Sequence, residues 1–264
     1  MTEWLPMFVL IGGLFLGLIT GFPMAFTLAG TSIITAMIFI GPHALAYVPS
    51  NTFGMMSNMV LIAMPLFIFM ACVLEKSEVT RDMFDFIHKL LGPLRGGLSM
   101  GTVLICAVIA AMSGVSTTAV VTMGIIALPI MLKQGYNKSI AIGPILAGGA
   151  LGLLIPPSIS LIVYGMVARV SIGKLFAGGI APGLILVFLF MSYIGIRSYF
   201  QPDVAPALPR KDRISWINLI KLSRSLILPV GIVTTLLGSI FAGIASPTEA
   251  AAVGVAGAMI SAAV

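Results

Sequence analysis

The stretch that decides the fold reads MSGVSTT, at residues 112–118, and it lies in the middle of an apolar region. A second irregular stretch follows it, GGALGLLIPPS at residues 148–158. Each places small residues, hydroxyls or prolines where an uninterrupted membrane helix would otherwise run. Hydrocarbon offers backbone groups no hydrogen-bond partners, so irregular backbone at membrane depth must be buried by protein or meet an ion or water. We therefore expect these two breaks to form the working centre of the chain.

The composition places the chain in a bilayer. Of its 264 residues, 59% are hydrophobic and 8% are charged, and the mean hydropathy is +1.15. Soluble domains carry about 25% charged residues, so we predict an all-α polytopic membrane protein. In a soluble protein a net charge of +6 would suggest a nucleic-acid partner. Here the cations gather in loops, as the positive-inside rule describes, and we expect no nucleic-acid binding.

The first half of the chain reads as a scaffold followed by an arm. Apolar runs predict three scaffold helices within residues 1–74, at 5–20, 24–40 and 59–74. Residues 41–58 form an uncharged loop, with a short interfacial helix inside it as the alternative. Residues 75–95 alternate charged residues with apolar ones at helical spacing. This pattern predicts an amphipathic arm in the membrane interface.

We predict a transport region over residues 96–170, comprising a hairpin (96–132) and a broken helix (139–170). Two structures fit the hairpin segment: a re-entrant hairpin with its tip mid-membrane, or one long kinked passage. Basic residues flank the segment on both sides, which favours the hairpin. In the broken helix, Pro156 and Pro157 remove two backbone donors in succession and free upstream carbonyls.

The remainder reads as one more span with a basic cytoplasmic arm (171–224) and then the start of a second repeat (225–264). Leu228-Pro229 and the glycine-containing run after it echo Leu5-Pro6, although a chance match is the alternative. The distribution of lysine and arginine gives the two segments opposite directions and puts the N-terminus in the periplasm. Inverted repeats of this kind are typical of secondary transporters. The final residues lie in an apolar run, so we expect the chain to be the N-terminal half of a longer transporter.

Four motifs carry a family resemblance, and their order and spacing match over nearly the whole chain: RGGLS at 95–99, SGVSTTA at 113–119, IPPSI at 155–159 and SPTEAAA at 246–252. With them the chain resembles the large membrane subunit of the tripartite ATP-independent periplasmic (TRAP) transporters, the DctM-like family. The resemblance implies an elevator-type, sodium-coupled importer of an organic acid, such as a dicarboxylate, keto acid or sugar acid, in the bacterial inner membrane. It also implies two partners, a small four-helix membrane subunit and a periplasmic substrate-binding protein.

The same resemblance implies a sodium site shared by the hairpin tip and the broken helix, at Ser113, Gly114, Ser116, Gly149, Gly152 and Pro156. The family often has hydroxyls where this chain has Gly148-Gly149, so ligands there would be backbone carbonyls. Neutral carbonyl and hydroxyl oxygens can bind a monovalent cation, and sodium is the coupling ion we expect. The helix N-termini that follow the two breaks favour a carboxylate, which makes Thr117, Thr118 and Ser158 the candidate substrate residues.

Other interpretations fit parts of the pattern. Residues 113–118 could form a helix-packing patch, because small and hydroxyl residues line membrane helix contacts in general. A passive anion channel, another ion-coupled transporter and a nonfunctional half-length fragment are the alternative functions. The chain does not resemble an intramembrane enzyme, because its two histidines are badly placed for a Ser–His pair.

Overall fold

A computed structural model describes residues 4–77, 79–207 and 224–263, and every regular element in these ranges is a helix. The predicted all-helical architecture is therefore confirmed for the described residues. The chain divides into two compact units, Met1–Asn58 and Met59–Val264, which we describe separately.

The first unit contains two paired helices, α1 (Leu5–Ile19) and α2 (Met24–Phe39), followed by η1 (Pro42–Ala46) and α3 (Tyr47–Met56). The uncharged segment 41–58 is thus largely helical, which agrees with the alternative of a short helix in it and exceeds that helix in extent. Its prolines do not interrupt these helices. Pro42 and Pro49 both fall in the first turn of a helix, where the missing N–H costs nothing, so they start helices instead of breaking them.

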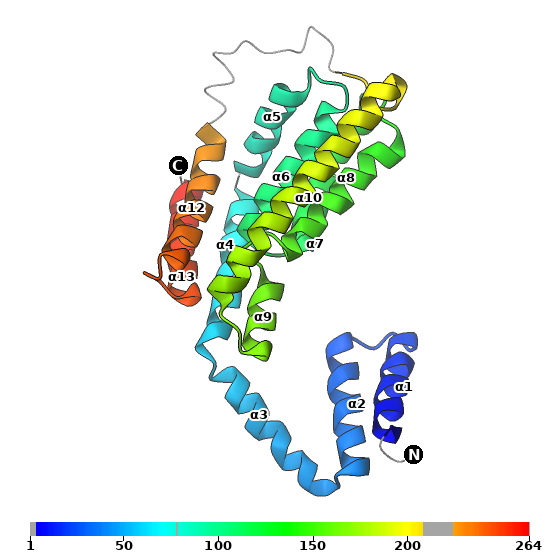
Figure 1. Ribbon diagram of the computed structural model, residues 1–264, viewed down its shortest axis with the longest axis vertical. Helices are drawn as coiled ribbons and strands as arrows, with labels where there is room; N and C mark the ends of the chain where they lie inside the picture. The colour runs from blue at the N-terminus through cyan, green and yellow to red at the C-terminus, as the bar shows by residue number, and fades with distance from the viewer. Residues whose placement is uncertain (1–3, 78, 208–223, 264) are drawn as a thin grey trace. The chain divides into compact units, whose positions relative to one another are not determined.

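The second unit holds the two predicted breaks, and Figure 1 shows α6, α7, α8 and α10 running side by side within it. Its elements are, in chain order, η2 (Met59–Ile62), α4 (Ala63–Lys76), α5 (Val79–Leu91), α6 (Gly97–Ser113), α7 (Ser116–Lys133), α8 (Lys138–Ala150), η3 (Leu151–Leu153), α9 (Ile159–Ala168), α10 (Ile172–Phe200), η4 (Pro202–Val204), α12 (Arg224–Phe241) and α13 (Pro247–Ala263).

Three helical segments in the described part of the chain are long and apolar enough to cross a membrane: Met59–Lys76, Ser116–Lys133 and Ile172–Phe200. Shorter apolar helices include α1, α2, α6 and α9. The third segment extends beyond the predicted span of 175–193 at both ends, and Pro182 lies inside the helix, as that span required. Of the predicted basic arm, residues 208–223 lie outside the described residues.

The segment predicted as an arm divides differently from the prediction. Helix α4 continues through Lys76 and ends where Ser77 takes an extended conformation, so Glu75 belongs to the last turn of α4. The amphipathic helix is α5, and its apolar residues Met83, Phe84 and Ile87 are buried. They pack beside α6, where Gly101 lies directly against Ile87.

Helices α6 and α7 fold back on each other. Ser99, near the start of α6, lies 3.5 Å from the sulfur of Met131, near the end of α7. The Ser99 hydroxyl also donates a hydrogen bond of 2.9 Å to the carbonyl of Ile140 in α8. These buried contacts join the three helices at the end away from the hairpin tip.

The segment after α10 forms hydrogen bonds at the same end of the bundle. The N–H of Gly96, which precedes α6, donates to the Ala205 carbonyl over 3.1 Å, and the N–H of Asn137, which precedes α8, donates to the Val204 carbonyl over 2.9 Å. The starts of α6 and α8 are thereby fixed to one short segment.

The last two helices, α12 and α13, lie in the segment predicted to start a second repeat. Helix α12 begins at Arg224, so Pro229 lies inside it, whereas Pro6 lies in the first turn of α1. Helix α13 starts with a reciprocal cap. The N–H and the hydroxyl of Ser246 each donate to the Glu249 carboxylate over 2.7 Å, and the Glu249 N–H donates to the Ser246 hydroxyl oxygen.

Candidate functional site: the junction of the hairpin tip and the broken helix

The hairpin tip is made by two residues with different backbone conformations. Gly114 ends α6 in the left-handed region, with φ of +63°, and Val115 is extended before α7 starts at Ser116. A glycine suits the first position because it has no Cβ to clash there. The hydroxyl of Ser113, which is 1% exposed, lies 3.3 Å from the N–H of Val115 and 3.2 Å from its carbonyl.

The second break follows η3 and ends at Ser158, which is extended before α9 begins. The peptide bond between Pro156 and Pro157 is cis. Neither proline can donate to the carbonyl four residues earlier, at Gly152 and Leu153. One of these two carbonyls finds another donor, because the hydroxyl of the fully buried Ser158 donates to the Leu153 carbonyl over 2.9 Å.

The two breaks touch each other. The N–H of Ile159, at the start of α9, donates to the carbonyl of Gly114 over 3.3 Å. A Cβ added to Gly114 would lie 2.6 Å from the Pro157 carbonyl oxygen. The hairpin tip is therefore in backbone contact with the interruption of the broken helix.

Glycines on the first half of the broken helix bring the two segments this close. A Cβ on Gly152 would lie 3.0 Å from the backbone nitrogen of Ser116. A Cβ on Gly149 would lie 3.2 Å from the Ser116 carbonyl and would overlap the Val120 side chain. Gly148 instead faces Cys106, so it closes the contact between α8 and α6.

The six residues predicted for sodium thus share one neighbourhood, with Gly149 and Gly152 against Ser116, and Pro156 in the break that contacts Gly114. The oxygen atoms there are backbone carbonyls and the hydroxyls of Ser113 and Ser116. Each carbonyl oxygen has two lone pairs, so one that accepts a hydrogen bond can still face a cation. Such neutral donors suit a weakly held monovalent ion.

Two helices also begin at this junction. The residues that precede α7 and α9 are Val115 and Ser158, and neither side chain caps its helix. The first-turn N–H groups of a helix have no partner inside it and lie at its positive end. The junction therefore combines carbonyl oxygens for a cation with helix N-termini that favour an anion.

The predicted substrate residues have different surroundings. Thr117 is exposed. Thr118 is partly exposed and faces a small cavity beside the hairpin. Ser158 is buried, with its hydroxyl bonded to Leu153. A solute could reach the exposed Thr117 side chain directly, whereas at the buried Ser158 it would meet the backbone of the helix start.

Sequence reasoning missed Glu75. Its carboxylate accepts a hydrogen bond of 3.0 Å from the hydroxyl of Thr122, on α7. The two residues share a small cavity between α4, α6 and α7, lined by Ala71, Glu75, Ile109, Met112, Ser113, Thr118 and Thr122. The sequence carried no clear signal for this pair, because Glu75 begins the charged stretch after the apolar run and Thr122 lies 47 residues further along the chain.

Comparison with known proteins places nearly all of the chain in one family. Residues 11–264 match the model of the family described as tripartite ATP-independent periplasmic transporter, DctM component. The chain is 35% identical over 248 residues to the C4-dicarboxylate TRAP transporter large permease protein DctM of Vibrio cholerae, covering 94% of this chain and 53% of that protein.

Two further relatives have different named solutes. The ectoine/5-hydroxyectoine TRAP transporter large permease protein UehC of Ruegeria pomeroyi is 34% identical, with coverage of 89% of this chain and 54% of the relative. The sialic acid TRAP transporter large permease protein SiaM of Vibrio cholerae is 30% identical, with coverage of 92% and 55%. The chain spans about half the length of these curated relatives. From the family match and these identities, the chain belongs to the DctM family of TRAP transporter large permease proteins.

Proposed function

We propose that the protein to which this chain contributes imports an organic acid across the bacterial inner membrane, driven by sodium. The observation that carries the proposal is the junction of the two breaks, where the Ile159 N–H meets the Gly114 carbonyl and Gly152 packs on Ser116. Membrane transporters commonly build ion and substrate sites where helices are discontinuous in this way.

In this proposal sodium is a co-transported substrate held by neutral oxygens. The candidate ligands are the hydroxyls of Ser113 and Ser116 and the backbone carbonyls at Gly114, Gly149 and Gly152, with Pro156 keeping the second break open. Because these ligands carry no full charge, the ion can leave again on the inner side. The close contacts at Gly152 and Gly149 support a fixed arrangement of the two segments.

The organic acid would bind at the N-termini of α7 and α9, beside the bound ion. Their first-turn N–H groups suit a carboxylate, and Thr117, Thr118 and Ser158 belong to these two helix starts. The relatives' names include C4-dicarboxylate and sialic acid, and both solutes carry carboxylates. Sodium beside the carboxylate would also offset its charge during the crossing.

The remaining elements of the proposal are the mode of motion and the partners. We propose an elevator in which the hairpin and broken helix move together, with an inverted second repeat outside this chain and the N-terminus in the periplasm. A small four-helix membrane subunit and a periplasmic binding protein would complete the system. The family's description as tripartite supports the two partners.

The test is uptake of radiolabelled organic acids into proteoliposomes that hold the complete large subunit and its small partner. Uptake is measured with and without an inward sodium gradient, and with and without the binding protein. We expect accumulation only when both are present. Uptake of equal extent with and without the sodium gradient would contradict the proposed sodium site and favour a passive anion pathway.

A variant pair assigns the ion to the junction. Ser116→Ala removes a hydroxyl at the start of α7, and Ser160→Ala removes an exposed hydroxyl from the first turn of α9 as the matched control. We expect Ser116→Ala to raise the sodium concentration needed for half-maximal uptake and Ser160→Ala to leave it unchanged. An unchanged sodium dependence in Ser116→Ala would remove the Ser116 hydroxyl from the proposed ion site.

A further inference from the structure

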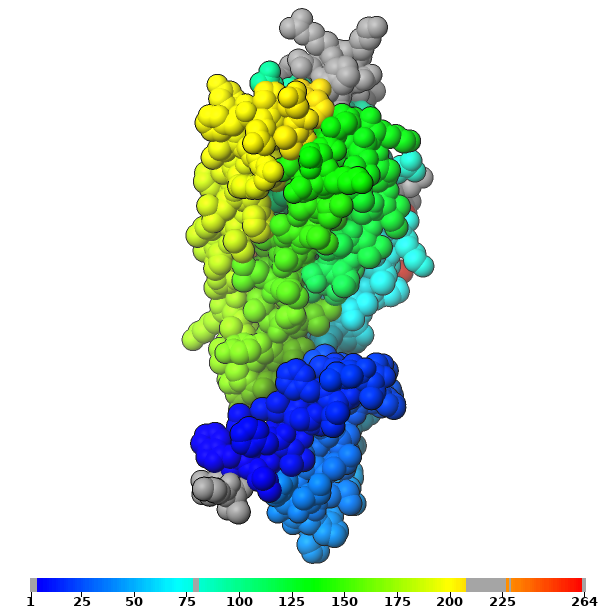
Figure 2. All heavy atoms as spheres, turned by 90° about the vertical axis from the view of Figure 1, so that its right-hand side faces the viewer, coloured from blue at the N-terminus to red at the C-terminus, as the bar shows by residue number. Residues whose placement is uncertain are grey.

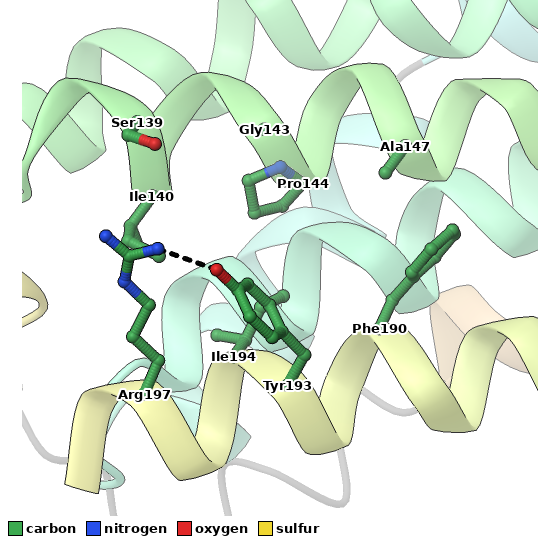
Figure 3. Close-up of a pocket in the computed structure, with 9 residues that line it drawn as sticks. All are labelled: Ser139, Ile140, Gly143, Pro144, Ala147, Phe190, Tyr193, Ile194 and Arg197. Carbon is green, nitrogen blue, oxygen red and sulfur yellow. Dashed lines mark hydrogen bonds between the residues drawn. The ribbon is translucent and has the colours of Figure 1, made fainter. Parts of the chain in front are cut away.

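A groove of about 380 Å³ runs between α8 and α10, away from the junction. In Figure 2 the spheres of α10 (yellow) and α8 (green) lie side by side on one face of the second unit. Figure 3 shows the groove's residues on the two helices: Ser139, Ile140, Gly143, Pro144 and Ala147 from α8, and Phe190, Tyr193, Ile194 and Arg197 from α10.

One end of the groove is apolar and bounded by small side chains. Gly143, Pro144 and Ala147 form its α8 side, opposite Phe190 (Figure 3). A Cβ added to Gly143 would meet no heavy atom within 4 Å, so space is open above this glycine. The dimensions and lining suit a hydrocarbon chain laid along the helices.

The other end of the groove is polar and positively charged. The Arg197 guanidinium donates a hydrogen bond to the Tyr193 hydroxyl over 2.6 Å and lies 6.0 Å from the centre of its ring. Figure 3 shows Ser139 on the α8 side of this same end. A guanidinium has five N–H donors, and none of the residues that line the groove is acidic. Arg197 can therefore donate to an anion while it keeps its bond to Tyr193.

The start of α8 adds to the positive field at this end. Helix α8 begins at Lys138, which is exposed, and the positive end of its dipole lies beside Ser139. Arg197 precedes the most basic part of the sequence, which the positive-inside rule places at the cytoplasmic surface. Anionic lipids are concentrated in that leaflet, and basic pockets between membrane helices bind their headgroups.

We propose that the groove between α8 and α10 binds an anionic phospholipid. Arg197 and the hydroxyls of Tyr193 and Ser139 hold the phosphate, and one acyl chain lies along Gly143 and Ala147 towards Phe190. The charge at one end selects an anion, and the apolar length selects a lipid over a small soluble acid. This site is separate from the junction and does not depend on the proposed transport function.

The experiment is native mass spectrometry of the complete large subunit with its small partner, released from micelles in the presence of phosphatidylglycerol or phosphatidylcholine. We expect phosphatidylglycerol adducts to persist at activation energies that remove phosphatidylcholine. Arg197→Gln should weaken the retained phosphatidylglycerol by about ten-fold, the size of effect expected for a lost charge-assisted hydrogen bond. Lys174→Gln, on the same helix but outside the groove, is the matched control and should change nothing.

A second pair of variants tests the apolar end. Gly143→Leu should fill the groove and abolish binding of the retained lipid while the protein remains folded. Gly124→Leu is the control, because a Cβ at Gly124 on α7 also meets no heavy atom within 4 Å. Thermal unfolding of each variant without added lipid shows whether the substitution itself disturbs the fold.

Three results would overturn the proposal. Equal retention of the two lipids would show that the groove does not select an anion, and displacement of phosphatidylglycerol by millimolar inorganic phosphate would show a site for a free anion. Absence of any retained lipid on the complete protein would show that another part of the protein covers the groove.

Discussion

The α1–α2 pair and the hairpin junction both rely on glycine, but they place different atoms against it. On α1, a Cβ at Gly17 would overlap the Cγ2 methyl of Thr27. At the junction, a Cβ at Gly152 would lie 3.0 Å from the backbone nitrogen of Ser116. The first contact is with a side chain that another substitution can shorten, and the second is with main chain that no substitution removes.

The difference separates two uses of small residues in membrane helices. Between α1 and α2, glycines let threonine side chains approach a neighbouring helix, as in many membrane helix pairs. At the junction they let one backbone reach another, which keeps carbonyl and N–H groups near each other. We therefore expect junction glycines to resist substitution and α1 glycines to accept it when the partner changes.

The largest effect should come from Gly114→Ala. The left-handed backbone costs an alanine about 1–2 kcal/mol. Its overlap with the Pro157 carbonyl adds a further ~1–3 kcal/mol. Thermal unfolding of the purified complete subunit measures the loss, with Gly124→Ala as a control that has open space around its Cβ. Equal melting temperatures for the two variants would contradict the backbone contact.

The next effect tests whether the α1 contact can be repaired. Gly17→Ala should destabilise the protein by ~1–3 kcal/mol, because the new methyl overlaps Thr27. Adding Thr27→Ala removes the obstructing atoms and should recover most of the stability lost in Gly17→Ala. The control Gly12→Ala should cost little stability, because no atom lies within 4 Å of its Cβ. If the double variant is no more stable than Gly17→Ala, the distinction between the two regions fails.

Ser158→Ala should have an intermediate effect at the junction. It removes the donor to the Leu153 carbonyl, and leaving a buried acceptor without a partner costs ~1–3 kcal/mol, partly recovered if water enters. Unfolding in denaturant gives the change, with the exposed Ser160→Ala as the comparison. A Ser158→Ala protein as stable as Ser160→Ala would show that the Leu153 carbonyl has another partner.

The smallest effect should come from the bond between Thr122 and Glu75. Thr122→Val keeps the side-chain shape and removes the donor, which should cost ~0.5–1.5 kcal/mol. Glu75→Ala and the double variant complete a double-mutant cycle, in which thermal unfolding measures the stability of each protein. Purely additive losses would mean that the two side chains do not interact.

The sequence located both breaks correctly because their signals are local. Gly114 permits a left-handed backbone and the two consecutive prolines remove donors, whatever surrounds them. The boundary of the arm was misplaced because nothing between Leu74 and Lys76 distinguishes a helix end from a helix interior. There Ser77 ends the helix.

The contacts within the site could not be predicted in the same way. Gly148 and Gly149 are adjacent in sequence, yet they face Cys106 and Ser116 respectively, because successive residues point to different sides of a helix. The bond from Thr122 to Glu75 joins segments far apart in the chain. Such pairings depend on how whole helices pack, and local sequence patterns do not predict that packing.

The bond between the Ile159 N–H and the Gly114 carbonyl also has a consequence for biosynthesis. The ribosome releases the hairpin before it releases α9, so the tip carbonyl enters the translocation channel ahead of its partner. A bare carbonyl is costly in hydrocarbon. The hairpin tip should therefore stay in the aqueous interior of the insertion machinery until the diproline segment arrives, and the two should enter the bilayer as one unit.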